Sequence, residues 1–418
     1  MTTKPPQSPP PIENTTCCIV GGGPAGMILA YLLAKEGVEV TLLESHNDFA
    51  REFRGDTFHA SSMELISALG LMDKLKPLIH SKLTQLGFIT QSGRFLTMAN
   101  FEKMNSRFPY VAVVPQSEFL TMLSEEAKAI PSFNLQMGAN VQDLVENNGK
   151  IIGVRYKKDN CSHELLTDLV VAADGRASRM RKKASIELKT SAPPMDVMWF
   201  RLPRENSDTD HKDDIEIRIG QGSLMVLLGR QDYWQCGHVV LKGAYHEIRQ
   251  AGLDKYREDL TSLLPDFLHN RIDNIDDWKK VAILAVQVGR VEKWHRPGLL
   301  LIGDAAHVMS PIGGVGINYA IQDAVAAYNC LCQPLKTGTL TEHDLDNVQN
   351  RREWPTKIMQ GIQTMAQQRI VKAALQSNGE FSLPLPLRII SKIPLLNKLP
   401  ARLLAYGIRH ETLTEIKS

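Results

Sequence analysis

Residues 17–26 read CCIVGGGPAG, and this stretch decides the fold. Four apolar residues typical of a buried strand lead directly into a G-x-G-x-x-G turn. Residues 24–36 then favour a helix that ends at Gly37, and residues 38–43 form a second apolar run typical of a buried parallel strand. This order of strand, turn, helix and strand predicts an α/β protein that carries a Rossmann-type βαβ unit.

The glycine turn has the features that hold the pyrophosphate of a dinucleotide. Its first glycine permits a tight turn, its second lets the backbone approach the phosphates, and its third lets the helix pack closely on the strand. The helix N-terminus adds amide donors and positive potential. An acidic residue at the end of the second strand can accept hydrogen bonds from ribose hydroxyls. The residues that we expect to bind the cofactor here are Gly21, Gly23, Pro24, Ala25, Gly26 and Glu44.

The bulk composition is that of an ordinary globular chain. With 418 residues, 43% of them hydrophobic and 22% charged, it is long enough to form two packed lobes. Its net charge of +2, with signs mixed along the chain, gives no reason to expect nucleic acid as a partner. The six cysteines lack metal-type spacing with histidines, so we expect no metal site, and Cys17 and Cys18 are expected to be buried, reduced thiols rather than disulfide-bonded. No apolar stretch reaches the ~20 residues of a membrane span, and we expect a soluble, cytoplasmic protein.

Two further motifs follow the glycine turn in the sequence. Residues 169–181, LVVAADGRASRMR, join an apolar strand to an Asp-Gly turn, with Ser and Arg at fixed offsets. Residues 300–307, LLIGDAAH, join a second buried strand to a Gly-Asp turn, and PIGGVGIN follows at 311–318. Together with the glycine turn, these blocks resemble the single-component FAD-dependent aromatic hydroxylases of the para-hydroxybenzoate hydroxylase type. The resemblance covers roughly residues 16–335.

The resemblance implies a role for each block in holding FAD. Asp304 matches a residue assigned to the ribityl chain, although an Asp at this point can also cap the helix that follows. The 311–318 loop would lie flat beneath the isoalloxazine ring, and the helix that begins there would aim its positive end at the reduced flavin. Asn318 can equally serve as a helix-start residue. The loop residues expected to contact FAD are Pro311, Gly314, Gly316, Ile317 and Asn318.

Several isolated polar residues also match the family. Arg54 corresponds to an arginine near the FAD pyrophosphate and Gln116 to a glutamine that contacts the cofactor, although either can instead be a surface residue. Asp174 is similar to a residue associated with both FAD and NAD(P)H. His59 and His307 are weak candidates for catalysis, because a packed loop histidine and local hydrogen bonding are the simpler interpretations.

The resemblance implies an enzyme that is a monooxygenase. NADH or NADPH would reduce FAD, and the reduced flavin would react with O2 to give a C4a-hydroperoxide that hydroxylates or epoxidises an aromatic or polycyclic small molecule. The sequence has no second G-x-G-x-x-G unit, so the nicotinamide would bind transiently in a groove. One alternative is a flavin-dependent reductase or dehydrogenase of isoprenoid or polycyclic substrates, similar to geranylgeranyl reductases. Another is a non-catalytic flavin-binding module.

Alternating apolar and polar residues between 195 and 240 predict an antiparallel sheet with one exposed face, where we expect the substrate. Its apolar bias suggests a bulky, weakly polar substrate. For each candidate residue, burial in the core of the sheet is the simpler interpretation. The candidates for substrate contact are Met198, Phe200, Met225, Leu227, Trp234 and His238.

The domain organisation follows from these changes in pattern. Residues 383–409 mix apolar with basic residues, which suggests a helical lid or a dimer contact, and less readily a membrane contact. We expect a monomer or a homodimer. The expected parts are a disordered tail (1–14), an FAD-binding domain in two segments (15–190 and 281–335), a substrate-binding β-sheet domain (191–280) and a helical C-terminal region (336–418).

Overall fold

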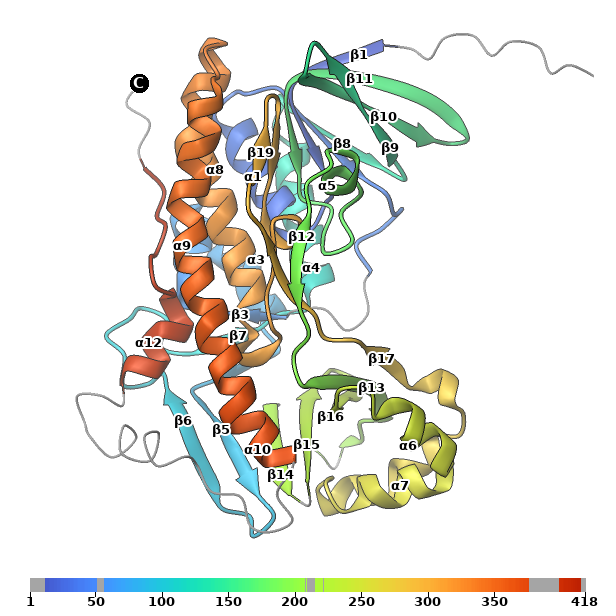
Figure 1. Ribbon diagram of the computed structural model, residues 1–418. Coiled ribbons are helices and arrows are strands. Elements are labelled where there is room, and N and C mark those ends of the chain that lie inside the picture. Colours follow the sequence, from blue (N-terminus) through green and yellow to red (C-terminus); the bar gives the residue numbers. More distant parts are fainter. Residues whose placement is uncertain are drawn as a thin grey trace, which may run out of the picture.

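The computed structural model shows two large sheets, two small three-stranded sheets (β12-β18-β21 and β3-β7-β4) and long helices beside them (Figure 1). It describes residues 12–50, 56–206, 208, 215–220, 222–375 and 398–414. The fold is mixed α/β, with a parallel sheet in the dinucleotide-binding part and a mostly antiparallel sheet in the other, as the sequence predicts.

The first sheet carries the predicted βαβ unit. Its strands follow the order β19-β20-β11-β1-β2-β8, and β10 and β9 extend it as antiparallel strands beside β11. From β20 to β8 the strands on this path pair in parallel. The bounds are β1 Ile12–Val20, β2 Val40–Glu44, β8 Phe133–Met137, β9 Asn140–Asn147, β10 Lys150–Lys158, β11 Cys161–Ala172, β19 His295–Arg296 and β20 Leu299–Leu301.

β1 begins earlier than the sequence suggests. Residues 12–14, which we expected in a disordered tail, pair in parallel with residues 164–166 of β11. The Tyr156 hydroxyl donates a hydrogen bond to Glu13 at 2.9 Å. The apolar run begins only at Cys17 because the first half of β1 is partly exposed. Backbone pairing with the long strand β11 extends β1, and hydrophobic pattern does not report such pairing.

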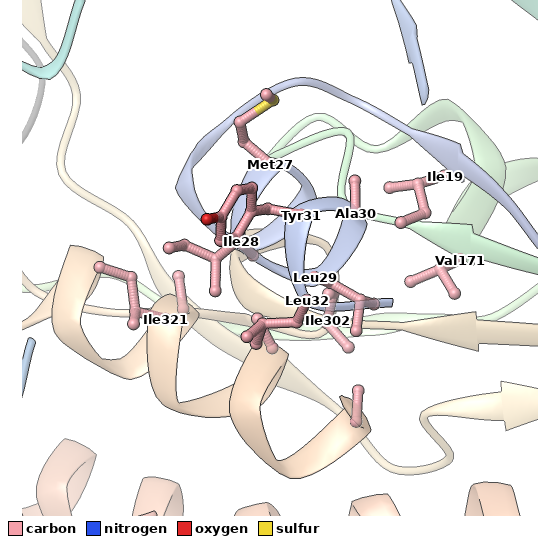
Figure 2. Close-up of a cluster of buried hydrophobic side chains, with 14 of the residues drawn as sticks. Ile19, Met27, Ile28, Leu29, Ala30, Tyr31, Leu32, Val171, Ile302 and Ile321 are labelled. Carbon is pink, nitrogen blue, oxygen red and sulfur yellow. The ribbon is translucent and has the colours of Figure 1, made fainter. Parts of the chain in front are cut away.

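The helix of the βαβ unit, α1 (Pro24–Lys35), lies between the first sheet and α8 (Gly316–Thr337). Residues 25–34 of α1 are all buried, as expected for a helix that is covered on every side. Figure 2 shows Ile28 on the side of Ile321 from α8, and Ile19 and Val171 on the side of the strands. This packing fixes the N-terminus of α1, where the glycine turn lies.

The second sheet has the strand order β17-β13-β16-β15-β14-β5-β6. Its central strands are antiparallel, as predicted, but β5 and β6 come from residues 85–100, far before the expected substrate domain. β14 pairs in parallel with β5, so both segments build one sheet. The bounds are β5 Gln85–Thr90, β6 Phe95–Asn100, β13 Met195–Pro203, β14 Ile215–Gly220, β15 Ser223–Gly229, β16 Tyr233–Leu241 and β17 Ala282–Leu284.

The two faces of the second sheet are buried in different surroundings. Successive side chains of a strand point to opposite faces. One face packs against α6 (Tyr245–Ala251), α7 (Leu253–Thr261) and the 3-10 helix at Asp266–Asn274, and it forms a separate hydrophobic core. The opposite face meets the helical turns at Gln367–Val371 and α10 (Lys372–Leu375).

The remaining elements connect the two sheets. α9 (Glu342–Ala366) runs beside α8 and leads down to the second sheet, while α12 (Lys398–Tyr406) lies near β6 and α2 (Figure 1). Over the described residues, no helix combines the length and apolar character needed to cross a membrane. The other bounds are α2 Ala60–Ala68, α3 Met72–Leu75, α4 Gln116–Lys128, α5 Arg179–Lys183, β3 Thr57–Phe58, β4 Ser81–Leu83, β7 Val111–Val113, β12 Leu188–Ser191, β18 Val288–Val291 and β21 His307–Val308.

Candidate cofactor and substrate site

A cavity of about 1260 Å³ runs from the glycine turn of the first sheet to one face of the second sheet. Small-molecule pockets usually measure ~300–1,000 Å³, so this cavity has room for a cofactor and a second ligand. Gly26 and Asn318 lie behind its wall, and Arg54 lies outside the described residues. The predicted cofactor residues that line it are Gly21, Gly23, Pro24, Ala25, Glu44, Gln116, Asp174, Asp304, Pro311, Gly314, Gly316 and Ile317.

The three glycines of the turn differ in what surrounds them. Gly21 has a φ of +106°, and a Cβ there would lie 2.5 Å from the carbonyl oxygen of Ala173. A Cβ on Gly26 would lie 2.0 Å from the carbonyl oxygen of Gly21. In contrast, no atom lies within 4 Å of the position of a Cβ on Gly23. The protein itself therefore requires the first and third glycines, whereas the second faces open space beside the amides of α1, where a pyrophosphate fits.

Glu44 is held by the turn that it faces. Its Oε2 accepts a hydrogen bond from the amide of Gly22 at 2.8 Å, and its Oε1 accepts one from the amide of His46 at 2.9 Å. The Glu44 side chain is buried at the end of β2. These bonds place its carboxylate on the cavity wall, and the ribose contact expected of it stays a prediction.

Asp174 folds the turn that follows β11. Its carboxylate accepts hydrogen bonds from the Ser178 hydroxyl and from a backbone amide of α5. Arg181 then donates to the carbonyl oxygen of Ala305 at 2.9 Å, which ties this turn to the Gly-Asp motif. Burial lowers the pKa of Arg181, and the charges of Asp174 and Asp304 oppose that shift. The two acidic motifs therefore form one connected wall of the cavity.

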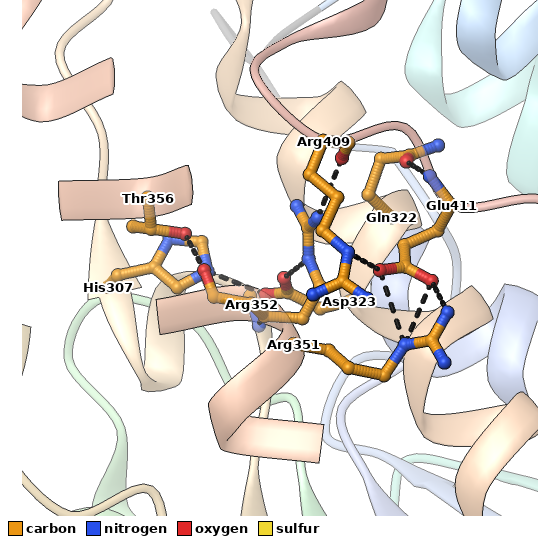
Figure 3. Close-up of polar contacts among 9 residues, drawn as sticks. His307, Gln322, Asp323, Arg351, Arg352, Thr356, Arg409 and Glu411 are labelled. Atoms are coloured by element: carbon orange, nitrogen blue, oxygen red, sulfur yellow. Dashed lines mark hydrogen bonds and ion pairs between the residues drawn. The ribbon is translucent and has the colours of Figure 1, made fainter. Parts of the chain in front are cut away.

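His307 belongs to a buried polar cluster behind this wall, shown in Figure 3. His307 Nε2 lies 2.5 Å from Asp323 Oδ2, and Arg352 Nε donates to Asp323 Oδ1 at 2.9 Å. The amide of Gly303 also donates to Asp323, at 3.0 Å. Burial alone would raise the pKa of Asp323, but His307 and Arg352 outweigh it and the pKa is lowered.

This cluster holds the Gly-Asp turn against α8 and α9, because Asp323 belongs to α8 and Arg352 to α9. The three side chains are at most 1% exposed, and none of them is among the residues that line the cavity. The structure therefore favours local hydrogen bonding over catalysis for His307.

The predicted flavin loop is shaped by close contacts. Gly314 has a φ of +62°, and its carbonyl oxygen accepts a hydrogen bond from the Thr57 hydroxyl at 2.9 Å. A Cβ on Gly314 would lie within 2.4 Å of that hydroxyl. Gly313 packs against Leu404 of α12, so the loop lies between β3 and the C-terminal helix. The N-terminus of α8, at Gly316, opens onto the cavity as the loop ends.

Every hydrogen-bonding group of the Asn318 side chain has a partner within the protein. Its Oδ1 accepts hydrogen bonds from the His59 amide at 2.9 Å and the Ser62 hydroxyl at 2.6 Å. Its Nδ2 donates to the carbonyl oxygens of Thr57 at 3.0 Å and Gly314 at 3.3 Å. A side-chain amide has two donor hydrogens and two acceptor lone pairs, and all are used here. The side chain therefore positions the flavin loop, and the cofactor contact expected of this residue stays a prediction.

His59 does line the cavity, next to the flavin loop. Its ring is buried, packs edge-on against Phe101, and neither ring nitrogen makes a hydrogen bond. Backbone groups of Gly313, Gly314 and Leu404 lie nearby. Burial lowers the pKa of His59 to about 4, so the ring is neutral near pH 7. It can therefore exchange a hydrogen bond with a ligand but does not provide a positive charge.

The sequence did not identify Asp56 and Arg230, which meet on the cavity wall beside Gln116. The carboxylate of Asp56 accepts a hydrogen bond from the Gln116 amide at 3.1 Å and pairs with Arg230 Nη2. Burial raises the pKa of Asp56, while Arg230 acts against that shift. The two residues are 174 positions apart in sequence. No local pattern predicts their meeting, although Asp56 lies in the run that contains Arg54.

The six candidate substrate residues lie on the face of the second sheet away from the cavity. Met198, Phe200, Met225, Leu227 and Trp234 belong to the core beneath α7, and His238 stacks on Tyr256 of that helix at 5.8 Å. Their neighbours along the strands face the cavity instead. Because successive side chains of a strand point to opposite faces, residues that pack beneath α7 cannot also face the cavity. The residues of the second sheet that line the cavity are Leu86, Gly87, Phe88, Met98, Ala99, Met195, Val197, Trp199, Ile215, Ile217, Leu224, Val226, Leu228, Gln235, Val239 and Leu284, and Arg230 lines it directly after β15.

The C-terminal helix also contributes to the cavity. Leu399, Pro400, Leu403 and Leu404 of α12 line it, which fits the helical lid that the sequence suggested. Leu399 is 56% exposed, so the helix presents an apolar side chain to solvent at the same time.

Known proteins are similar to this chain over most of its length. Residues 14–361 match the model of the FAD binding domain family. A 6-methylpretetramide 4-monooxygenase from Streptomyces rimosus is 32% identical over 390 residues, which cover 92% of this chain and 90% of that protein. A pentachlorophenol 4-monooxygenase from Sphingobium chlorophenolicum is 24% identical over 72% of this chain, but the match spans only 55% of that relative.

Solved structures have the same fold. The p-nitrophenol 4-monooxygenase PnpA from Pseudomonas putida DLL-E4 superposes with a TM-score of 0.78 over 95% of this chain and 100% of that one, at 18% identity. The OxyS anhydrotetracycline hydroxylase from Streptomyces rimosus superposes with a TM-score of 0.74 over 96% of this chain and 78% of that one, at 21% identity. At these identities the likeness establishes the fold.

Proposed function

The chain belongs to the FAD binding domain family and is an FAD-dependent monooxygenase, and we propose that it hydroxylates a polycyclic aromatic small molecule. The observation that carries the proposal is the single cavity that joins the glycine turn to the apolar face of the second sheet. Its cofactor end has the open space at Gly23, and its other end is walled by branched and aromatic side chains.

The residues of this chain perform the tasks that such a reaction leaves to the protein. Bound FAD supplies the transfer of electrons from a reduced nicotinamide to O2 and of one oxygen atom to the substrate. The glycine turn, Glu44 and Asp304 would hold the cofactor, and Asn318 fixes the loop beside it. The apolar side chains of the second sheet and of α12 exclude water from the space where the substrate binds.

The size and character of the cavity support a flat, apolar substrate. Val197, Val226 and Leu228 form a surface on which several fused rings can lie. The relative with 32% identity is named as a 4-monooxygenase of 6-methylpretetramide. A single ring would leave much of this wall uncovered.

The test is aerobic turnover with the FAD-loaded enzyme. We expect consumption of NADH or NADPH, with matching consumption of O2, when polycyclic phenols are supplied, and much slower consumption with single-ring phenols. Mass spectrometry of the product should show one added oxygen atom that derives from O2. Equal turnover of single-ring and polycyclic phenols would overturn the proposed substrate class.

The same assay separates the enzyme from its main alternative. A flavin-dependent reductase of polycyclic or isoprenoid substrates would oxidise the nicotinamide without O2 and give a reduced product. Turnover under nitrogen to such a product would therefore contradict oxygenation. The cytoplasmic location, the monomeric or homodimeric state and the use of either NADH or NADPH as electron donor stay predictions of this proposal.

A further inference from the structure

Arg230 follows β15 on the cavity wall, and the protein supplies hydrogen-bond partners for only part of its guanidinium group. The residue is 6% exposed and lines the cavity. Its Nη2 pairs with Asp56 and donates to Gln235 Oε1 at 2.8 Å, and its Nε donates to the same oxygen at 3.2 Å. Nη1 is buried and has no hydrogen-bond partner.

The unsatisfied group is a donor, which limits what can bind there. A guanidinium has five N–H groups, of which two belong to Nη1. Leaving a charged donor buried without a partner costs free energy, so a ligand that accepts a hydrogen bond from Nη1 is stabilised at this place on the cavity wall. Asp56 already accepts from Arg230 and from the amide of Gln116. The matching group on a ligand is therefore an oxygen acceptor.

Arg230 lies where the cofactor loop meets the substrate wall. Thr57, next to Asp56, donates its hydroxyl to Gly314 of the flavin loop. On the sheet, the neighbours of Arg230 in the cavity are mostly apolar, such as Leu228 and Val226. Electrostatic attraction is stronger in such surroundings than in water. The other charged residues that line the cavity are Glu44, Asp174, Arg176, Arg179 and Asp304 in the cofactor part, Asp56 beside Arg230, and the exposed Arg369 of the helical turns after α9.

We propose that Arg230 determines substrate specificity by donating from Nη1 to an ionised phenol or enol oxygen of the polycyclic substrate. The inference rests on the proposed function and adds a chemical requirement to it, namely an acidic hydroxyl at a fixed place on the ring system. The proton of that hydroxyl leaves to solvent when the substrate binds. The remaining anion donates electron density into the ring, which favours attack by an electrophilic oxygen.

An equilibrium binding experiment tests the proposal without turnover. The FAD-loaded enzyme is titrated with a dihydroxyanthraquinone, whose ionised form absorbs at longer wavelength, and with its dimethyl ether, which cannot ionise. The cation of Arg230 lowers the pKa of a bound phenol, and the carboxylate of Asp56 beside it acts against that shift, so we expect the pKa of the phenol to fall by about 1 unit. We also expect the ether to bind at least about tenfold more weakly.

Three variants separate substrate contact from structural support. R230M removes the donor but leaves Asp56 buried without its cation, so the double variant D56N/R230M removes both charges and keeps the result interpretable if R230M does not fold. R218M is the matched control, because Arg218 is ion-paired with Glu216 on β14 of the same sheet and is not among the residues that line the cavity. We expect the double variant to lose the preference for the phenol and R218M to keep it.

The outcomes that overturn the proposal are distinct from failure of the proposed function. A bound phenol with the same pKa as in water, or equal binding of phenol and ether by the unaltered enzyme, would overturn it. So would a double variant that keeps the phenol preference while FAD affinity or the flavin potential changes, since Nη1 would then serve the cofactor. Failure of oxygenation would instead appear only in the turnover assay.

Discussion

Two of the buried ion pairs in this protein are of the same type, Asp323 with Arg352 and Asp56 with Arg230. They differ in how far the protein itself satisfies the hydrogen bonds of their charged groups. Asp323 accepts hydrogen bonds from Arg352, from the Gly303 amide and from His307 in a cluster with side chains at most 1% exposed. Arg230 pairs with Asp56 on the cavity wall and keeps one nitrogen without a partner. We call the first pair closed, because other protein groups surround it, and the second open, because one donor on its cavity side has no partner.

The difference shows how to separate support from function in a site where charged residues are crowded. A buried charge whose hydrogen bonds are all made by the protein stabilises the fold and has little left for a ligand. A buried charge with an unused donor beside a cavity is stabilised fully only when a ligand binds. By this criterion Asn318 supports the site, and Arg230 keeps a donor that is open to a ligand.

The largest expected effect comes from breaking the closed pair. Asp323→Ala leaves the cation of Arg352 buried without its partner, which typically costs about 3–5 kcal/mol. We expect a large fall in the urea midpoint, followed by circular dichroism, together with loss of bound FAD because the Gly-Asp turn loosens. Asp143→Ala is the control, because its exposed pair with Lys183 should contribute at most about 1 kcal/mol. Equal midpoints for the two variants would refute the assignment of Asp323 as a stabilising residue.

The glycine turn likewise contains one position that is filled by the protein, Gly26, and one that faces the cavity, Gly23. Gly26→Ala forces a methyl group against the carbonyl of Gly21, and such overpacking typically costs about 1–3 kcal/mol. Gly23→Ala meets no protein atom, so we expect stability within about 0.5 kcal/mol of the original and FAD affinity at least tenfold lower, or about 1.4 kcal/mol. Urea unfolding and FAD fluorescence titration measure the two quantities. A Gly23→Ala protein with normal FAD affinity would show that the cofactor does not approach this residue.

Lowering the pH should reduce the stability of the fold through two buried histidines, one at the cavity and one in the core behind the sheet. Burial lowers the pKa of both His59 and His238 to about 4. An unfolded histidine titrates near ~6.5, so each stabilises the fold above that pH and loses this contribution as the pH falls toward the folded pKa. At about pH 5 each loss approaches about 2 kcal/mol. His59→Phe and His238→Phe should therefore each reduce the acid sensitivity of the unfolding midpoint.

A bound polycyclic ligand should distinguish these two histidines. His59 lines the cavity, and His238 packs against Tyr256 on the other side of the sheet. NMR titration should show the ligand changing the pKa of His59 and leaving that of His238 unaltered. The same change at both would mean that the ligand acts through the whole fold.

Much of the cofactor site was predictable from sequence because its geometry is local. The turn at Gly21–Gly26, the Asp-Gly and Gly-Asp motifs and the strands before them are each encoded within about a dozen residues. The hairpin of β5 and β6 was not assigned to the second sheet, because its pairing with β14 joins residues more than a hundred positions apart. For the same reason the pair of Asp56 and Arg230 was missed.

The candidate substrate residues lie on the face away from the cavity for a different reason. Strands β13, β15 and β16 are apolar on both faces, one against α7 and the other toward the cavity. Periodicity then shows that two faces exist but not which of them meets the ligand. Phe200 and Trp234, two of the candidates, fill the core beneath α7, which was the simpler interpretation of both.

The smallest expected effect on stability tests this assignment of faces directly. Val226→Leu adds one methylene to the cavity wall, where a partly buried side chain has room, so we expect stability within about 0.5 kcal/mol of the original. Substrate choice should still change, because one methylene in a pocket shifts discrimination by about 1–3 kcal/mol. Leu227→Val, its neighbour on the other face, should cost about 1 kcal/mol of stability and leave the ratios of kcat/KM among polycyclic phenols unaltered. If Leu227→Val changed those ratios and Val226→Leu did not, the substrate would lie on the α7 side of the sheet.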